Sequence, residues 1–185
     1  MVSNDERAAQ VIADTSGWID RVVIGLGLCP FANSVTTKNL VRYRATDAST
    51  ETELLLVLEQ ELLALASADP TVVDTTVLIH PDVLRDFLDY NDFLDVADDK
   101  LQELELERDF QIASFHPDYA FAGAPADDPA NYSNRSPYPM LHLLREASVS
   151  RAVEAFPDAS RIYERNVATL RGLGAAAIAR LVKGE

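Results

Sequence analysis

The segment that most constrains the fold of this chain is the run Thr75-Thr76-Val77-Leu78-Ile79. It is strongly β-prone, and its hydrophobicity is nearly continuous rather than alternating. A strand of this kind is covered on both faces, as the strands of parallel sheets are. Helices on both sides of a sheet provide such cover, so the run predicts an α/β fold.

Two further strands and two helices are predicted around this run. Short β-prone strands are expected over 40–46 and 110–115. A helix capped by Ser49 or Thr50 precedes the run, and a helix over 82–105 follows it, with apolar side chains at steps of three and four residues. The order strand–helix–strand–helix–strand gives two right-handed βαβ units and parallel strands.

The whole chain is therefore predicted to be an α/β protein with a small three-stranded, mainly parallel sheet (βαβαβ), flanked by an N-terminal helix and several C-terminal helices. The N-terminal helix is expected over 5–24, and the C-terminal helices near 139–147, 149–156 and 159–182. Residues 117–138 are rich in proline, and a loop of this length is either functional or conceals short structure. We expect one globular domain over residues 1–185.

The net charge of −14 limits the partners of the chain. A phosphate backbone is repelled by such a surface, so we expect no nucleic-acid partner. The charge is uneven, because residues 135–185 carry 8 basic and 5 acidic side chains, a net charge of +3. An anion-binding surface is therefore expected to draw on the C-terminal third.

The chain has one cysteine, and its first residues are polar and acidic. A single cysteine forms no intrachain disulfide, which is typical of a reducing compartment. The N-terminus lacks a secretion signal, and no apolar stretch approaches the length of a membrane span. These features predict a cytoplasmic protein without a membrane partner. No helix has an obvious surplus apolar face, so the oligomeric state is not predicted.

Two predicted strands end in the dipeptide His-Pro, at His80 and at His116. If the strands are parallel, both imidazoles lie at the carboxyl edge of the sheet, where ligands bind in open α/β sheets. His116 also opens the long loop, which favours a functional role. The alternative is that each histidine caps a backbone group where its strand ends.

Cys29 precedes Pro30, a residue type that favours the first position of a helix. A thiol at a helix N-terminus is held more readily as the nucleophilic thiolate. Position 32 is Ala, so dithiol exchange within the chain is excluded. The alternative is that Cys29 is a small core residue.

The densest group of polar side chains lies between Asn131 and Arg145. Prolines stiffen this segment, and arginine offers a planar fork for a carboxylate or phosphate. The alternative is a structural loop held by its own hydrogen bonds. His142, among leucines, is interpreted as a core histidine rather than a ligand. The candidate binding residues of the segment are Tyr132, Asn134, Arg135, Ser136 and Arg145.

Several short motifs together resemble one family. The chain is similar to the bacterial domain-of-unknown-function family number 1415 over nearly its whole length. The resemblance implies a bacterial, cytoplasmic, stand-alone protein of this size, and it assigns no activity, cofactor or functional residue. The motifs that carry it are Leu28-Cys29-Pro30-Phe31-Ala32, Tyr90-Asn91-Asp92-Phe93-Leu94, Ala113-Ser114-Phe115-His116-Pro117, Asn134-Arg135-Ser136-Pro137-Tyr138-Pro139 and Leu141-His142-Leu143-Leu144-Arg145-Glu146.

Three functional hypotheses follow from these residues. In the first, the protein is an enzyme acting on a small anionic metabolite, with Cys29 as nucleophile, His116 as general base and acid, and Arg135 and Arg145 holding the anion. In the second, Cys29 and two of the three histidines bind a metal. In the third, the acidic helix face from Asp82 to Asp99 binds a basic partner without chemistry, and the segment 82–109 around it has 11 acidic and 3 basic residues. No nucleotide-binding or hydrolase signature is present, and the cofactor is not predicted.

Overall fold

A computed structural model describes residues 3–155 and 161–185. Its centre is a four-stranded sheet with the order β1-β2-β4-β3. β1 and β2 run parallel, and β4 is antiparallel to both of its neighbours, so β3 has the same direction as β1 and β2. The strands are β1 (Val41–Ala45), β2 (Thr75–Ile79), β3 (Phe110–Phe115) and β4 (Met140–Arg145).

The α/β class is confirmed, and β1, β2 and β3 lie where strands were predicted. The prediction of a three-stranded, mainly parallel sheet is wrong, because β4 lies between β2 and β3. The segment at 139–147, predicted as a helix, is largely this strand. Leu141 and Leu143 are fully buried on one face of the sheet, while Met140 belongs to the core on the other. This period-two burial is the signature of a strand, and the many leucines concealed it.

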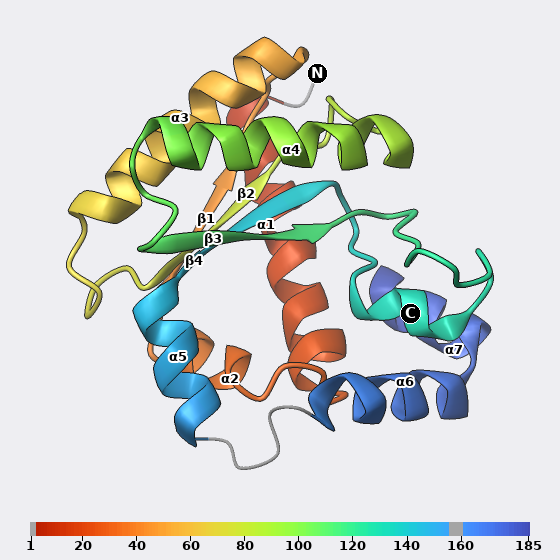
Figure 1. The fold of residues 1–185 in the computed structure, drawn as a ribbon. Helices are drawn as coiled ribbons and strands as arrows, with labels where there is room; N and C mark the ends of the chain where they lie inside the picture. The colour runs from red at the N-terminus through yellow and green to blue at the C-terminus, as the bar shows by residue number, and fades with distance from the viewer. Residues whose placement is uncertain (1–2, 156–160) are drawn as a thin grey trace.

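One face of the sheet is covered by α3 (Glu51–Ser67) and α4 (Phe87–Glu103), which lie above it in Figure 1. Thr50 caps α3, as predicted, in a capping box with Glu53. The predicted helix over 82–105 begins only at Phe87, because Asp86 is its N-cap and accepts hydrogen bonds from the backbone of Leu88 and Asp89. The core on this face includes Leu54, Leu58, Leu62, Tyr90, Phe93, Leu141 and Leu143.

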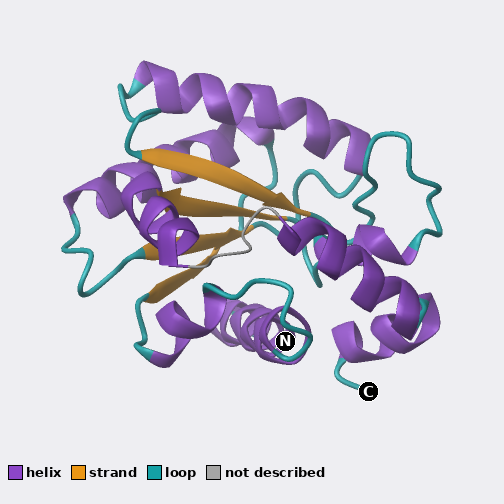
Figure 2. Cartoon of the chain, turned by 60° about the horizontal axis from the view of Figure 1, so that its bottom comes forward, coloured by secondary structure: helices purple, strands orange, loops and turns teal. Residues whose placement is uncertain are grey.

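The other face is covered by helices from both ends of the chain (Figure 2). The predicted N-terminal helix is confirmed as α1 (Asn4–Trp18), which continues as the π-helix η1 (Ile19–Ile24). α2 (Ala32–Thr37) and α5 (Glu146–Ala155) follow in chain order. Trp18, Val22, Leu170 and Ile178 bring α1, η1 and the C-terminal helices into one core with Val77 and Ile79.

The C-terminal helices are α6 (Ile162–Leu173) and α7 (Ala175–Lys183), where one helix over 159–182 was predicted. They are separate because Gly174 has a φ of 79°, a conformation that ends a helix and suits glycine. Parts of the two predicted helices, at 156 and 159–160, lie outside the described residues. No helix in the part of the chain that the structure describes is long and apolar enough to cross a membrane.

Candidate functional site

A cavity of about 880 Å³ lies on the α2 and α5 side of the sheet. Ligand sites commonly have volumes of about 300–1,000 Å³, so this cavity is large enough for a small molecule. Its floor is formed by side chains of β2, β3 and β4 that point away from α3 and α4, and its sides by α2 and α5. Most of its wall is apolar and includes Phe31, Val35, Leu40, Ala113, Phe115 and Leu144.

His142 is the imidazole of this cavity, and β4 places it on the floor. Its Nε2 lies 2.7 Å from the Thr75 hydroxyl oxygen, and that oxygen lies 2.7 Å from the Leu143 carbonyl oxygen. A carbonyl only accepts, so the single hydroxyl proton of Thr75 is donated to Leu143. His142 must therefore donate its Nε2–H to Thr75, which leaves Nδ1 as a hydrogen-bond acceptor.

Burial lowers the pKa of His142 to about 4, well below the ordinary value of 6.5. The ring is therefore neutral at pH 7. Because its tautomer is fixed by Thr75, it offers an acceptor rather than a positive charge. The predicted helix around His142 is wrong, because β4 is a strand and directs His142 toward the cavity.

Cys29 also lines the cavity and is half-buried. The predicted helix after Pro30 is present, but α2 begins at Ala32 and has only six residues. Cys29 precedes it in a turn, where its carbonyl accepts a hydrogen bond from the backbone of Ala32. The thiol thus lies in the cavity wall, three positions before the helix rather than at its first residue.

Three cations contribute to the cavity, namely Lys38, Arg145 and Arg151. Asp74 is the only carboxylate among the described lining residues. It accepts a 2.6 Å hydrogen bond from Ser148, whose oxygen accepts one of 2.9 Å from Arg151. These two hydrogen bonds join α5 to Asp74, the residue before β2, and hold Arg151 at the rim of the cavity. In a chain with a net charge of −14, the cavity is a positively charged region.

Arg145 has a structural role in addition to its place at the cavity. Its guanidinium donates to the carbonyls of Leu65 and Ala68 at the C-terminal end of α3 and stacks on the Phe110 ring at 5.2 Å. A cation at this end of a helix satisfies carbonyls that have no partner within the helix. Lys38 and Arg151 are exposed and are better placed than Arg145 to meet a charged ligand.

His80 and His116 lie at the same edge of the sheet, as predicted, because β2 and β3 run in the same direction. They are fully buried and are not part of the wall of the cavity. His116 Nε2 bonds to the Leu84 carbonyl at 3.2 Å, and its Nδ1 accepts the backbone N–H of Asp118 at 3.0 Å. The structure thus groups Cys29 with His142 and Arg145, while His116 lies elsewhere.

The polar side chains of 131–138 bond mainly to the chain itself. Arg135 donates to the carbonyls of Tyr119 and Ala126 and lies over the Tyr132 ring at 4.9 Å. Asn134 donates to the Ser114 carbonyl, and Ser136 to the Tyr138 carbonyl. Together these contacts fix residues 117–138 against the end of β3.

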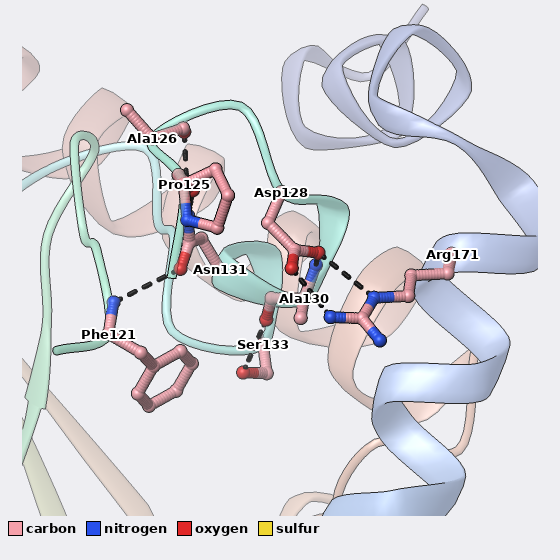
Figure 3. A network of polar contacts seen from close by, with 8 residues as sticks. All are labelled: Phe121, Pro125, Ala126, Asp128, Ala130, Asn131, Ser133 and Arg171. Atoms are coloured by element: carbon pink, nitrogen blue, oxygen red, sulfur yellow. Dashed lines mark hydrogen bonds and ion pairs between the residues drawn. The ribbon is translucent and has the colours of Figure 1, made fainter. Parts of the chain in front are cut away.

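Asn131 and Asp128 complete this arrangement and are drawn in Figure 3. Asn131 is fully buried, accepts the backbone N–H of Phe121 and donates to the carbonyl of Pro125. Asp128 forms an ion pair with Arg171 of α6, and this contact lowers the pKa of Asp128 to about 2. The long loop therefore conceals a short 3-10 helix, η2 (Pro129–Ser133), joined to α6.

Residues 3–155 and 161–185 contain no group of three histidine, cysteine, aspartate or glutamate side chains arranged to hold a metal ion. The acidic side chains of α4 at Asp89, Asp92, Asp95 and Asp99 are exposed. Exposure to solvent is enough to explain these carboxylates, so they do not call for a basic partner protein.

Comparison with known proteins places the chain in a family. The model of a family described as protein of unknown function, DUF1415, matches residues 10–180. The chain belongs to the DUF1415 family. No curated protein matches this DUF1415 chain, and no solved structure matches it.

The sequence analysis did not select three residues of the cavity, Lys38, Thr75 and Arg151, and it considered His142 only as a core histidine or a metal ligand. The sequence Met140–Arg145 does not alternate between apolar and polar residues, so only the strand in the structure shows that His142 and Leu144 point to one face. Lys38 and Arg151 gave no signal of their own, since they stand among other polar residues on short helices.

Proposed function

We propose that this DUF1415 protein binds a small, mainly apolar molecule with an anionic group in the cavity between the sheet, α2 and α5. The observation that supports the proposal is the composition of the wall, which combines apolar side chains with three cations and one carboxylate. Apolar walls with a few placed polar groups are typical of small-molecule sites. The sequence analysis also predicted a small anionic ligand, but at the segment around Arg135, whereas we propose that it binds in the cavity.

Each part of such a ligand has a partner in the cavity. Phe115 and Leu144 on the floor contact the apolar part, while Lys38 and Arg151 at the rim attract the anionic group. Within residues 3–155 and 161–185, the Lys38 ammonium has no partner, so it is available to a ligand. His142 Nδ1 accepts a hydrogen bond from a hydroxyl or N–H of the ligand.

Binding of 8-anilinonaphthalene-1-sulfonate tests the proposal, because this probe joins an apolar ring system to an anion. The double variant Lys38→Gln/Arg151→Gln is expected to raise its Kd by about fivefold for each cation removed, with less effect at high salt. The matched control is Arg180→Gln/Lys183→Gln on α7, which makes the same change in net charge away from the cavity. Equal Kd values for both double variants would contradict the proposal.

A steric variant tests the position of the ligand independently of charge. Ala113 of β3 lines the floor, so Ala113→Phe fills part of the 880 Å³. The probe is expected to lose most of its affinity for this variant, while circular dichroism reports whether the fold is kept. If a folded Ala113→Phe protein bound the probe with full affinity, the probe would bind outside the cavity and the proposed site would be wrong.

A second candidate function is thiol chemistry in the same cavity, favoured by the presence of Cys29 and His142 in one wall. In this proposal His142, rather than His116, orients the thiol by accepting its hydrogen bond at Nδ1. Alkylation by iodoacetamide reports the reactivity of Cys29, the one cysteine of the chain. The rate is expected to fall in His142→Gln and when the anionic probe is bound, and a rate that changes in neither case would remove this candidate.

A further inference from the structure

Two buried histidines hold one loop at the carboxyl edge of the sheet. Residues 81–86, the 81–86 loop, connect the end of β2 to α4. His80 Nδ1 lies 3.0 Å from the Val83 carbonyl oxygen, and His116 Nε2 lies 3.2 Å from that of Leu84. Because carbonyls only accept, each ring must donate an N–H. Histidines from two different strands therefore bind two successive carbonyls of the same loop.

The loop depends on these contacts because its backbone is strained. Leu84 has a φ of 56°, in the left-handed region that side chains other than glycine seldom occupy. Val83 and Leu84 are nevertheless buried, with exposed fractions of 6% and 7%. The conformation costs free energy that burial and the two histidine bonds must offset.

Both rings hold the loop in the neutral state. His116 donates from Nε2 and accepts the backbone N–H of Asp118 at Nδ1. A proton on Nδ1 would place two N–H donors, that of the ring and that of Asp118, opposite each other and break this hydrogen bond. His80 donates from Nδ1, and within the described residues its buried Nε2 has no hydrogen-bond partner. A proton on Nε2 would be a buried donor without an acceptor, and it would charge the core.

The carbonyls of Val83 and Leu84 favour the protonated rings, and so do two carboxylates at His116, but burial outweighs these contacts at both histidines. The Tyr90 ring lies 5.9 Å from His80 and 5.1 Å from His116, so two protonated rings would both pack against one aromatic side chain. Phe87 also packs on His116, and Tyr119 packs on Phe87. Asp86 and Asp118 are the carboxylates that act on His116, and the charged group that acts on His80 is His116 itself.

We infer that His80 and His116 form an acid-sensitive latch, which holds the 81–86 loop on the sheet while both rings are neutral and releases it when they are protonated. This inference does not depend on the proposed ligand cavity, which lies on the other face of the sheet. Burial lowers the pKa of His80 to about 4 and also lowers that of His116. Protons are therefore taken up on opening, and each ring raises the opening equilibrium by up to about tenfold per pH unit below 6.5.

Nitrogen-15 NMR of the three histidine rings tests the latch in the unaltered protein. At pH 7, His80 is expected as the Nδ1–H tautomer and His116 as the Nε2–H tautomer. Between pH 6.5 and 4, amide exchange at Asp118 and Leu88, corrected for intrinsic rates, is expected to accelerate before the core amides of β2. Leu88 reports on the loop because its N–H is bonded to Asp86.

The double variant His80→Asn/His116→Gln is the decisive comparison. The amide nitrogens of these side chains replace the donating ring nitrogens, but they do not titrate. The acid-induced acceleration of amide exchange at Leu88 is expected to disappear in the double variant. Asp86 is present in both the variant and the unaltered protein, so its own titration affects Leu88 equally in the two. The control His142→Gln removes the third imidazole and should keep the acid response at Leu88.

Two results would overturn the latch. One is ordinary titration of both rings near pH 6.5 in the unaltered protein without faster exchange at Asp118 or Leu88. The other is acid opening in the double variant at the same pH as in the unaltered protein. The first measurement needs no variant, so it decides the question even if the double variant fails to fold.

Discussion

Thr75 of β2 and His142 of β4 share a 2.7 Å hydrogen bond whose direction is set by the second bond of Thr75, to the Leu143 carbonyl. The two residues are on adjacent strands, and both line the cavity. A threonine hydroxyl thus determines which nitrogen of the imidazole carries the proton. Because Nε2 carries the proton, the Nδ1 of His142 is a hydrogen-bond acceptor on the floor of the cavity.

Thr75→Val is expected to remove the constraint on the His142 tautomer and to leave the buried Nε2–H of His142 without the hydroxyl that accepts it. Its cost is about 2 kcal/mol in the free energy of unfolding. Ring nitrogen shifts at pH 7 report the tautomer, and chemical denaturation reports the stability. Thr75→Ser keeps the hydroxyl and should keep the Nε2–H tautomer; the same tautomer in Thr75→Val would contradict the assignment.

His142 is expected to make stability depend on pH. Its pKa is about 4 in the folded protein and 6.5 in the reference state, so the unfolded chain binds the proton more readily. Its contribution is complete above pH 6.5 and is lost as the pH falls toward 4, by about 1 kcal/mol per pH unit. The difference in unfolding free energy between the unaltered protein and His142→Gln, measured from pH 7 to 4, should shrink accordingly. A constant difference would refute this account.

Tyr90→Phe is expected to destabilise the protein by about 2 kcal/mol. The Tyr90 hydroxyl donates to the Met140 carbonyl at 2.8 Å and accepts the Phe115 N–H at 3.0 Å, so it joins α4 to the end of the β3–β4 ladder. Its loss removes the buried side-chain hydrogen bonds to both of these backbone groups. Tyr163→Phe is the control, because Tyr163 is 60% exposed, and it should change the unfolding free energy by less than about 0.5 kcal/mol. Similar effects of the two variants would argue against the bridge.

Asn131→Leu tests the interior of the long loop. Asn131 accepts one backbone N–H and donates to carbonyls of the same loop, and it is fully buried. The variant is expected to lose about 2–3 kcal/mol of stability and to raise proteolysis between residues 117 and 128. Asn33→Ala, at an exposed position of α2, is the matched control. Unchanged protease resistance would show that the loop is held by other contacts.

Local patterns predicted much of the scaffold. The runs at 75–79 and 110–115 became strands with those bounds, and Thr50 caps α3, because β-propensity and capping act over a few residues. The segment 139–147 was misjudged, since a leucine-rich run after proline fits a buried strand as well as a helix. Whether this segment forms a strand or a helix depends on whether it can pair with β2 and β3 in the sheet. One domain over the whole chain stays a prediction.

The candidate site was predictable only in part, as its residues show. Cys29 and Arg145 were selected for their chemistry and do line the cavity. Arg135 has the same chemistry, but its guanidinium is used by the carbonyls of Tyr119 and Ala126. The grouping of Cys29, His116 and Arg135 as catalytic and binding residues stays untested, and the geometry favours His142 as the partner of Cys29.

The sequence by itself determined the α/β class, the direction shared by β2 and β3, and the place of His80 and His116 at one edge of the sheet. These features follow from short-range propensity and from the handedness of βαβ connections. Tertiary structure alone decided that β4 enters the sheet, that His142 meets Thr75, and that Cys29 and Arg151 share one cavity. Those pairings join residues far apart in the chain, and they depend on how sheet and helices pack, which no local pattern encodes.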